Sequence, residues 1–256
     1  MSETVKMNSL QAVNAALHEA MAADPKVILL GEDVADREGG GVTGATKGLS
    51  TAFGDDRVKS TPIAEQAIIG AAIGAALGGY KPVAEIMLMN FTTVAMDMIV
   101  NHAAKLRFMS GGQSQVPITI RTLTGAGWQT AGQHADHLEG WFCHTAGLKV
   151  VAPSNPADYK GLLLSCIQDP DPCIFIESAG SLFAQAEVAK DQGPIPLGKA
   201  RVVQEGKDVT IVSWSSQVVR CQQALPALAE AGISVELIDL RTVSPWDREA
   251  VLASAE

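Results

Sequence analysis

Short runs of consecutive apolar residues alternate along this chain with longer segments in which apolar residues recur every three or four positions. Runs of the first kind are typical of strands buried on both faces, and segments of the second kind are typical of helices that cover a sheet. The expected strands are residues 26–30, 82–88, 116–121, 148–152 and 173–177. Their alternation with helices predicts an α/β fold, a parallel sheet with helices on both faces.

Capping residues and glycines mark where some of these elements begin and end. Asn8 or Ser9 is suited to cap a first helix, and Asn155 followed by Pro156 is suited to begin another. A further helix is expected from about residue 92 to 109. The glycine-rich segment 39–48 is expected to be a loop, and it lacks the GxxxxGK[ST] pattern of a phosphate-binding loop.

The segment STPIAEQAIIGAAIGAALGG, residues 60–79, predicts a helix that is apolar on all sides. Gly70, Gly74 and Gly78 recur every four residues, so they form a smooth stripe that lets another element approach closely. A helix of this composition belongs in an interior or an interface, because neither of its sides suits water.

Glu65 is the acidic residue of this apolar segment. With Thr61 as N-cap and Pro62 as the first helical residue, the capping-box position falls on Ala64, one residue before Glu65. An acidic side chain here can simply complement the helix dipole. Burial would instead disfavour its charged form and leave an acid able to exchange a proton. The pattern alone leaves both interpretations open.

The regular pattern is interrupted after residue 177. Residues 178–206 are expected to be a connector that contains proline and glycine, and two further strands, 208–214 and 234–239, are each followed by a helix. Two parallel strands are too few for an independent α/β domain, so this second domain is expected to be incomplete. The predicted division is a first domain at 1–177, a linker at 178–206 and the start of a second domain at 207–256.

Composition narrows the functional classes. Hydrophobic residues make up 47% and charged residues 18% of the 256 residues, an ordinary globular balance. The net charge of −9, without any run of Lys or Arg, argues against binding to nucleic acid.

The longest apolar run, 67–77, is too short to span a bilayer, and the start MSETVKMNS resembles no signal or transit peptide. The four cysteines show no CxxC spacing, which favours reduced thiols. These features predict a cytoplasmic protein, or one of the mitochondrial matrix if a transit peptide has been removed.

Longer segments resemble the beta subunit of the thiamine-diphosphate-dependent first component of 2-oxo acid dehydrogenase complexes, of the pyruvate, branched-chain and acetoin types. The matching segments are LLGEDV, TPIAEQAIIGAAIGAAL, AEIMLMNF, NHAAKLRFMSGGQ, VPITIRT, GQHADHLEGWFCHTAGLKVVAPSNPADYKGLLLSCIQDPDPCIFIE, VTIVSWSSQV and VELIDLRTVSPWD. They span nearly the whole chain in the family's order and spacing. The resemblance implies a pyrimidine-binding domain of the transketolase type, followed by the start of a transketolase C-terminal-type domain.

The resemblance also implies roles for particular side chains. Glu65 would share a proton with the pyrimidine ring of the cofactor, which an amide could not exchange. Ile63, Met87 and Phe91 would line the pyrimidine pocket; otherwise they are ordinary core residues. His134 would orient substrate or lipoyl groups and transfer protons, for which an imidazole is suited at neutral pH. Without the resemblance, His134 would be taken as a solvated loop histidine.

Some positions depart from the family's pattern. Ala135 and Asp136 follow His134 where Ser and Gln are usual, and Met98 stands where many members carry Gln. These differences leave the hydrogen bonding around His134, and with it the substrate preference, open. A transition-metal site at His134, Asp136 and His137 is disfavoured, since it lacks helical spacing and a third clear ligand.

Some members of the family bind a structural potassium ion where a helix ends before a strand. Carbonyl groups freed at the end of a helix can hold such a cation. The corresponding positions here are Ile118, Cys166, Ile167, Asp169 and Asp171. A capped turn without an ion is the alternative.

The family's diphosphate and magnesium motif, Gly-Asp-Gly with a downstream Asn, does not occur in the chain. The resemblance therefore implies an alpha subunit that supplies the magnesium site for a shared thiamine diphosphate, in an alpha2beta2 heterotetramer. The implied reaction is decarboxylation of a 2-oxo acid, or cleavage of acetoin, with transfer of the acyl group to lipoamide on the acyltransferase core.

Two alternatives remain at this point. One is a transketolase-like or deoxyxylulose-phosphate-synthase-like half-chain that acts on sugar phosphates, and the other is a non-catalytic subunit that only docks to the core. The substrate also stays open, because GGGVTGATKGL leans toward acetoin-type members and GLLLSCIQDPDPCIF toward branched-chain ones.

Overall fold

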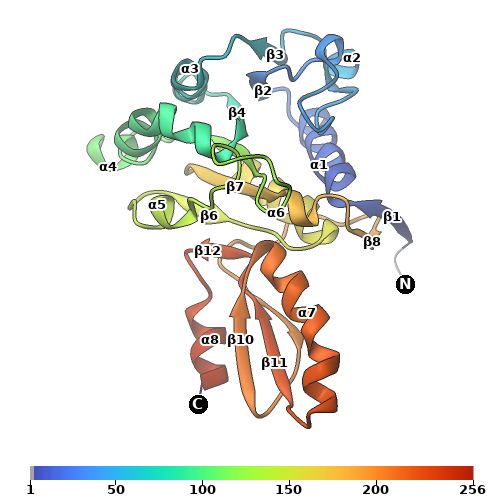
Figure 1. The fold of residues 1–256 in the computed structure, drawn as a ribbon. Helices are drawn as coiled ribbons and strands as arrows, with labels where there is room; N and C mark the ends of the chain where they lie inside the picture. The colour runs from blue at the N-terminus through green and yellow to red at the C-terminus, as the bar shows by residue number, and fades with distance from the viewer. Residues whose placement is uncertain (1–2, 256) are drawn as a thin grey trace.

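The computed structural model describes residues 3–255, and its centre is a seven-stranded sheet (Figure 1). The strands are β2 (Val27–Glu32), β3 (Val58–Thr61), β4 (Lys81–Leu88), β5 (Thr119–Thr124), β6 (Lys149–Val151), β7 (Cys173–Ser178) and β12 (Thr242–Ser244). Their order is β12-β6-β7-β5-β4-β2-β3, and every neighbouring pair is parallel except β12 with β6. The predicted α/β class with a parallel sheet is confirmed.

Helices cover both faces of this sheet. The first face is covered by α1 (Ser9–Ala23) and α6 (Pro156–Gln168), and the second by α3 (Glu65–Leu77), η2 (Met89–Ala95), η3 (Met98–Ala103) and α5 (Glu139–Cys143). Three short helices complete this part: η1 (Asp36–Glu38), α2 (Leu49–Phe53) and α4 (Leu106–Met109). Because successive strand residues face opposite sides, Val83 packs in the first core and Ala84 in the second.

The predicted caps are correct for two helices and wrong for a third. Asn8 forms a capping box with Gln11 at the start of α1, and the Asn155 side chain caps α6. Helix α3, in contrast, begins after Ala64 rather than after Thr61. Thr61 still belongs to β3, where it pairs with Glu32, so its backbone is extended and cannot open a helix.

Two other boundaries differ from the sequence-based expectation. The long helix expected at 92–109 is divided into η2, the π-helix η3 and α4. At its start the hydroxyls of Thr92 and Thr93 donate to the carbonyls of Met89 and Asn90, in competition with regular helical bonding. Strand β5 begins three residues later than expected, after Pro117, which cannot donate to a strand ladder.

The outer side of α3 is exposed in this chain. Ile68, Ile69 and Ile73 are buried against the sheet, whereas Gly74 and Leu77 face outward. A Cβ at Gly70 would meet the Met98 sulfur at 3.6 Å, and one at Gly74 would meet nothing within 4 Å. The glycine stripe therefore serves close packing at Gly70 and leaves an apolar outer surface at Gly74.

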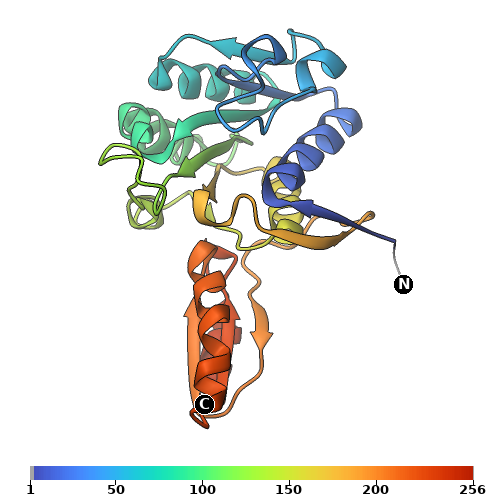
Figure 2. The same cartoon turned by 45° about the vertical axis from the view of Figure 1, so that its right-hand side comes forward.

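A smaller sheet follows in the C-terminal part of the chain and lies beyond the β12 edge of the large sheet (Figures 1 and 2). It consists of β9 (Arg201–Gln204), β10 (Val209–Ser213) and β11 (Val235–Asp239), in the order β10-β11-β9, with helices α7 (Ser215–Glu230) and α8 (Arg248–Ala255). The expected pair of parallel strands, β10 and β11, is present, and the antiparallel β9 extends it.

The segment expected to be a connector, 178–206, carries regular structure. It contains η4 (Ala179–Ser181), β9, and β8 (Gln185–Ala189), which pairs antiparallel with β1 (Thr4–Asn8). Strand β12 comes from beyond β11 and yet joins the large sheet. The two parts of the chain thus share strands across the proposed boundaries.

Two buried aspartates form ion pairs where the two parts meet. Arg241 Nη2 lies 2.8 Å from Asp158 Oδ1, and Arg201 Nη2 lies 3.3 Å from Asp239 Oδ2. Burial raises the pKa of Asp239, while the Ser154 hydroxyl donates to its carboxylate at 2.5 Å. Two arginines balance two aspartates here, so the junction is held without an unpaired buried charge.

Among residues 3–255, no helix has both the length and the apolar composition needed to cross a bilayer.

Candidate functional site

Glu65 lies at the first position of α3, directly after β3 and its short connection. The N-cap, Ala64, offers no side-chain acceptor to the open backbone N–H groups of this helix. The Glu65 side chain is half-buried, and within residues 3–255 no hydrogen bond engages its carboxylate. An acceptor at the carboxyl edge of a parallel sheet, with no partner of its own, is available to a ligand.

Glu32 is a second acidic residue at this edge, at the end of β2. Burial, and then the negative charges of Asp33 and Glu65, raise the pKa of the Glu32 carboxyl. Glu32 and Glu65 are therefore close enough to interact electrostatically. The sequence analysis assigned no role to Glu32, although its place directly after the expected strand 26–30 was a signal for a site residue.

The three apolar residues assigned to the pyrimidine pocket lie on three elements. Met87 belongs to β4 and Phe91 to η2, and both are half-buried. Ile63 lies between β3 and α3 and is 75% exposed. A large apolar side chain that is exposed in the isolated chain is suited to be covered by a ligand or by a partner subunit.

The structure brings Phe91 and His134 together. Their ring centroids are 5.5 Å apart at an interplanar angle of 76°, an edge-to-face contact. His134 Nδ1 is buried and has no hydrogen-bond partner among the described residues. A buried nitrogen without a partner is costly, so His134 is suited to bind a group from outside the chain.

His134 belongs to the loop 125–138, which is closed at its base. The Gly125 N–H donates to the His134 carbonyl at 2.8 Å, and the Thr124 hydroxyl donates to the Asp136 carbonyl at 3.0 Å. A Cβ at Gly125 would lie 2.5 Å from the His134 carbonyl oxygen, so only glycine fits there.

Asp136, one of the departures from the family's pattern, holds this loop to η2. The Asn90 side-chain amide donates to Asp136 Oδ2 at 2.6 Å, and the Asp136 N–H donates to Asn90 Oδ1 at 3.2 Å. Asn90 thus supplies the hydrogen bonds of Asp136, two residues after His134, and none to the His134 ring.

His137 is paired with a carboxylate rather than grouped with other metal ligands. Its Nδ1 lies 3.1 Å from Glu139 Oε1, and this hydrogen bond raises the pKa of His137. Among residues 3–255 there is no group of three or more His, Cys, Asp or Glu side chains placed to hold a metal ion.

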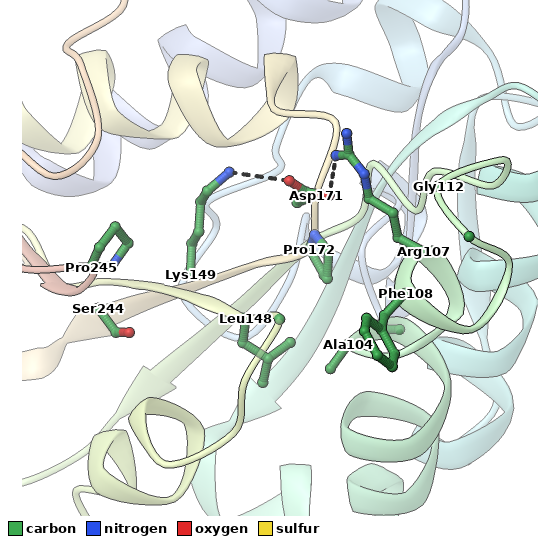
Figure 3. Close-up of a pocket in the computed structure, with 13 residues that line it drawn as sticks. Ala104, Arg107, Phe108, Gly112, Leu148, Lys149, Asp171, Pro172, Ser244 and Pro245 are labelled. Atoms are coloured by element: carbon green, nitrogen blue, oxygen red, sulfur yellow. Dashed lines mark hydrogen bonds and ion pairs between the residues drawn. The ribbon is translucent and has the colours of Figure 1, made fainter.

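The positions assigned to potassium meet at the end of α6, near the amino ends of β6 and β7. Lys149 Nζ lies 2.5 Å from Asp169 Oδ1. Asp171 is paired with both cations: its Oδ1 lies 2.6 Å from Arg107 Nη1, and its Oδ2 lies 3.6 Å from Lys149 Nζ (Figure 3). Both carboxylates are thus neutralised by side chains of the protein. The carbonyl oxygens of Ile118 and Cys166 each accept one backbone hydrogen bond and retain a second lone pair. A potassium ion here would be held by carbonyl oxygens rather than by the two carboxylates.

A cavity of about 670 Å³ lies beside this cluster (Figure 3). Its walls include Phe108, Leu148, Lys149, Pro172 and Pro245. Because Lys149 begins β6 and Pro172 precedes β7, the cavity is at the amino edge of the parallel strands. The residues assigned to the cofactor lie at the opposite, carboxyl edge, so this cavity is not the candidate cofactor site.

Family comparison agrees with the fold. The transketolase pyrimidine-binding domain matches residues 5–184, and the transketolase C-terminal domain matches residues 198–256. The chain therefore belongs to the class of proteins built on the transketolase-type pyrimidine-binding domain.

Relatives narrow this class. The chain is 45% identical to the beta subunit of acetoin:2,6-dichlorophenolindophenol oxidoreductase from Cupriavidus necator, over 98% of this chain and 76% of the relative. It is 44% identical to the corresponding subunit from Bacillus subtilis, over 100% of this chain and 77% of the relative. It is also 44% identical to the beta subunit of the pyruvate dehydrogenase E1 component from Acholeplasma laidlawii, over 96% and 75%. The chain belongs to the family of these beta subunits, as the sequence motifs predicted.

Solved structures support the same fold at lower identity. A split-gene transketolase, described as an inactive beta4 tetramer, has a TM-score of 0.80 at 22% identity, over 97% of this chain and 76% of that chain. Transketolase from Pichia stipitis, in complex with sedoheptulose 7-phosphate, has a TM-score of 0.71 at 18% identity, over 96% and 36%.

Proposed function

We propose that the chain is the beta subunit of a thiamine-diphosphate-dependent dehydrogenase that acts on a 2-oxo acid or on acetoin. The observation that carries this proposal is the pair of unsatisfied polar groups at the carboxyl edge of the sheet. Glu65 and His134 each have a polar atom without a partner, in a chain that shares 44–45% identity with beta subunits of such enzymes.

The residues at this edge fit the pyrimidine half of the cofactor. Glu65 would bind a ring nitrogen, and Ile63, Met87 and Phe91 would contact the ring faces. When bound, thiamine diphosphate supplies the electron sink that makes loss of carbon dioxide from a 2-oxo acid possible. The diphosphate and magnesium ion would be held by an alpha subunit.

Glu65 would exchange a proton with the ring nitrogen. Its place at the first position of α3, without a hydrogen-bond partner among the described residues, leaves the carboxyl group free to bind that nitrogen. A carboxyl group can accept and return a proton there, which an amide cannot do.

His134 would serve the substrate. Its contact with Phe91 places the imidazole next to a residue assigned to the cofactor. The imidazole would transfer protons to or from a substrate or lipoyl group, and the Asn90–Asp136 pair keeps the loop in place.

The expected assembly is an alpha2beta2 heterotetramer docked to a lipoyl acyltransferase core, located in the cytoplasm. Relatives are named as beta subunits, which supports a requirement for an alpha partner. The exposed apolar residues Ile63 and Leu77 at the two ends of α3 are suited to such an interface.

The sugar-phosphate alternative has less support. The relatives named as beta subunits of acetoin oxidoreductase or of pyruvate dehydrogenase are about twice as similar in sequence to this chain as the transketolases of known structure, at 44–45% against 18–22% identity. The non-catalytic alternative would leave the unpartnered carboxylate of Glu65 without a role, and the following experiment tests it directly.

The test is Glu65→Gln in the complex with the alpha subunit, assayed with pyruvate, branched-chain 2-oxo acids and acetoin. Turnover should fall by about 100-fold or more, since the amide cannot exchange the proton. Glu205→Gln, at an exposed position away from the site, is the matched control and should retain activity. Complex formation measured on the same samples separates loss of chemistry from loss of assembly. Near-normal turnover of the Glu65 variant would reject the assignment.

A further inference from the structure

A second hollow lies between the loop that carries His134 and the first turns of α7. Its volume is about 430 Å³. Four polar side chains of α7 line it: Ser216, Gln217, Arg220 and Gln223. None of the residues assigned to the cofactor lies in its walls.

These four side chains line the same hollow but form no hydrogen bonds with one another. Within residues 3–255, no hydrogen bond or ion pair engages the side chains of Ser216, Gln217, Arg220 or Gln223. Arg220 in particular is a cation without a carboxylate partner, although the chain carries a net charge of −9. The walls of the hollow contain no Asp or Glu. An unpaired guanidinium in a hollow without acidic groups favours an anion.

The start of α7 adds backbone donors to the same place. This helix has 16 residues, and its N-cap, Trp214, makes no side-chain capping bond. The Ser215 N–H donates to the Ala152 carbonyl at 3.1 Å, which leaves the next N–H groups of the first turn for another acceptor. The positive end of the helix dipole favours a bound anion, as the positive charge of Arg220 does.

An independent sign of a missing partner comes from Ser178, at the end of β7. Its hydroxyl is fully buried and has no hydrogen-bond partner among the described residues. A Cβ built on Gly180, which lines the hollow, would lie 3.7 Å from the hydroxyl oxygens of both Ser178 and Ser216. Ser178 therefore lies behind Gly180, outside the lining of the hollow, and only Ser216 of these two serines lines it.

The opposite wall is formed by the loop 125–138. His137 holds Glu139 through Nδ1, so its Nε2 remains free. Trp128 stacks on Phe183 at a centroid distance of 5.7 Å and an interplanar angle of 5°, which fixes its ring as a flat apolar surface.

We propose that this hollow binds a small organic anion. Its carboxylate or phosphate group would lie against Arg220 and the start of α7, and its apolar body would lie on Trp128. The volume suits a small molecule rather than a protein segment. An occupant would link α7 to the loop that carries His134 and would restrict the motion of that loop. The hollow is thus a candidate effector site that goes beyond the proposed function of the chain.

The test is calorimetric titration of the full chain, alone and with its alpha subunit, with acetate and with inorganic phosphate as the two probes. At least one probe should bind to the native chain, and Arg220→Gln should weaken its binding by about tenfold or more. Arg248→Gln is the matched control, because Arg248 is also exposed near the start of a helix but lies outside the hollow. Gln223→Glu should also abolish binding, since it adds a negative charge to the wall.

Hydrogen exchange gives a second measurement that does not depend on catalysis. Bound anion should slow the exchange of backbone amides in residues 126–137 of the native chain and not of the Arg220 variant. The tighter of the two probes identifies the anionic group as carboxylate or phosphate. Absence of binding by both probes, or equal binding to the native chain and the Arg220 variant, would overturn the proposal.

Discussion

Asn90 and Asp136 bind each other through two hydrogen bonds, of 2.6 and 3.2 Å, although they are 46 residues apart in the sequence. Asn90 lies in η2 beside Phe91, and Asp136 lies two residues after His134. The pair thereby connects the wall of the candidate cofactor pocket to the loop that carries the candidate catalytic histidine.

Removal of this pair should loosen the loop without unfolding the chain. For Asn90→Ala we expect about a fivefold lower kcat in the assembled enzyme, which corresponds to roughly 1 kcal/mol. Faster hydrogen exchange in residues 125–138 should accompany the change. Asn101→Ala removes a similar bond to Asp97 on η3 and is the control. Equal effects of the two substitutions would show that the Asn90–Asp136 pair has no special role.

The pair of His137 and Glu139 should make the same loop sensitive to pH. Hydrogen bonding to Glu139 raises the pKa of His137 above 6.5. A group whose pKa is raised on folding contributes its full stabilisation below its unfolded pKa and loses it as the pH rises through the folded value. The protection of the loop amides, meaning their exchange rate relative to the base-catalysed rate of an unstructured peptide at the same pH, should therefore fall as the pH rises from about 6.5 through the folded pKa of His137.

The pKa of Glu139 determines the low pH at which the pair stops stabilising the loop. Burial opposes its ionisation, but the hydrogen bond from His137 is among the interactions that bring its net pKa below 4.5. Its contribution is therefore present above pH 4.5 and is lost as the pH falls through the lowered pKa. The measurement is an NMR titration of the His137 ring with hydrogen exchange across the same range. His137→Gln should remove the dependence above pH 6.5, and its persistence in that variant would assign it to another group.

Arg121 stabilises the sheet by separating two buried carboxylates. Its Nη1 lies 2.7 Å from Glu85 Oε2, and its Nη2 lies 2.5 Å from Glu177 Oε1. Arg121→Met would leave both carboxylates buried without a partner, and we expect a loss of about 3 to 5 kcal/mol in the free energy of unfolding. Burial raises the pKa of Glu177, as expected for a cluster with one excess negative charge.

The comparison variant for Arg121 is Glu177→Gln, which leaves one carboxylate and one guanidinium. Its loss should be smaller, about 1 kcal/mol, because no buried charge remains unpaired. Both values come from denaturant unfolding. Equal losses for the two variants would show that charge balance does not govern the stability of this cluster.

Potassium can be tested through thermal stability. If the carbonyl oxygens at the end of α6 hold an ion, the melting temperature should be about 2 to 4 °C higher in potassium chloride than in choline chloride of equal ionic strength, for about 1 kcal/mol of stabilisation. Sodium chloride controls for a general effect of alkali cations. Identical melting temperatures in all three salts would remove potassium from the list of cofactors.

The local sequence was sufficient where local interactions determine the structure. The caps at Asn8 and Asn155 depend on side chains within three residues of the helix start, and both were predicted. The continuous apolar strands likewise predicted a covered parallel sheet. The start of α3 was mispredicted because Thr61 pairs with Glu32 in a neighbouring strand, and no window around Thr61 contains that information.

For the candidate site too, the sequence predicted some features and only the folded structure showed the others. The motifs identified Glu65 and His134 and the family to which the chain belongs, since residue types and spacing survive without any coordinates. Three relationships came only from the folded chain: the contact of Phe91 with His134, the electrostatic interaction of Glu32 with Glu65, and the bond between Asn90 and Asp136.

The sequence by itself determined the class of fold and the family, and it supplied Glu65 and His134 as the candidate acidic and imidazole groups. These depend on the order and spacing of residues along one chain. Only the tertiary structure decided which groups meet, such as the polar face of α7 and the loop of His134 around one hollow. Hydrogen bonds and charges act over a few ångströms in space, whereas the partners that they join here are tens of residues apart in the chain.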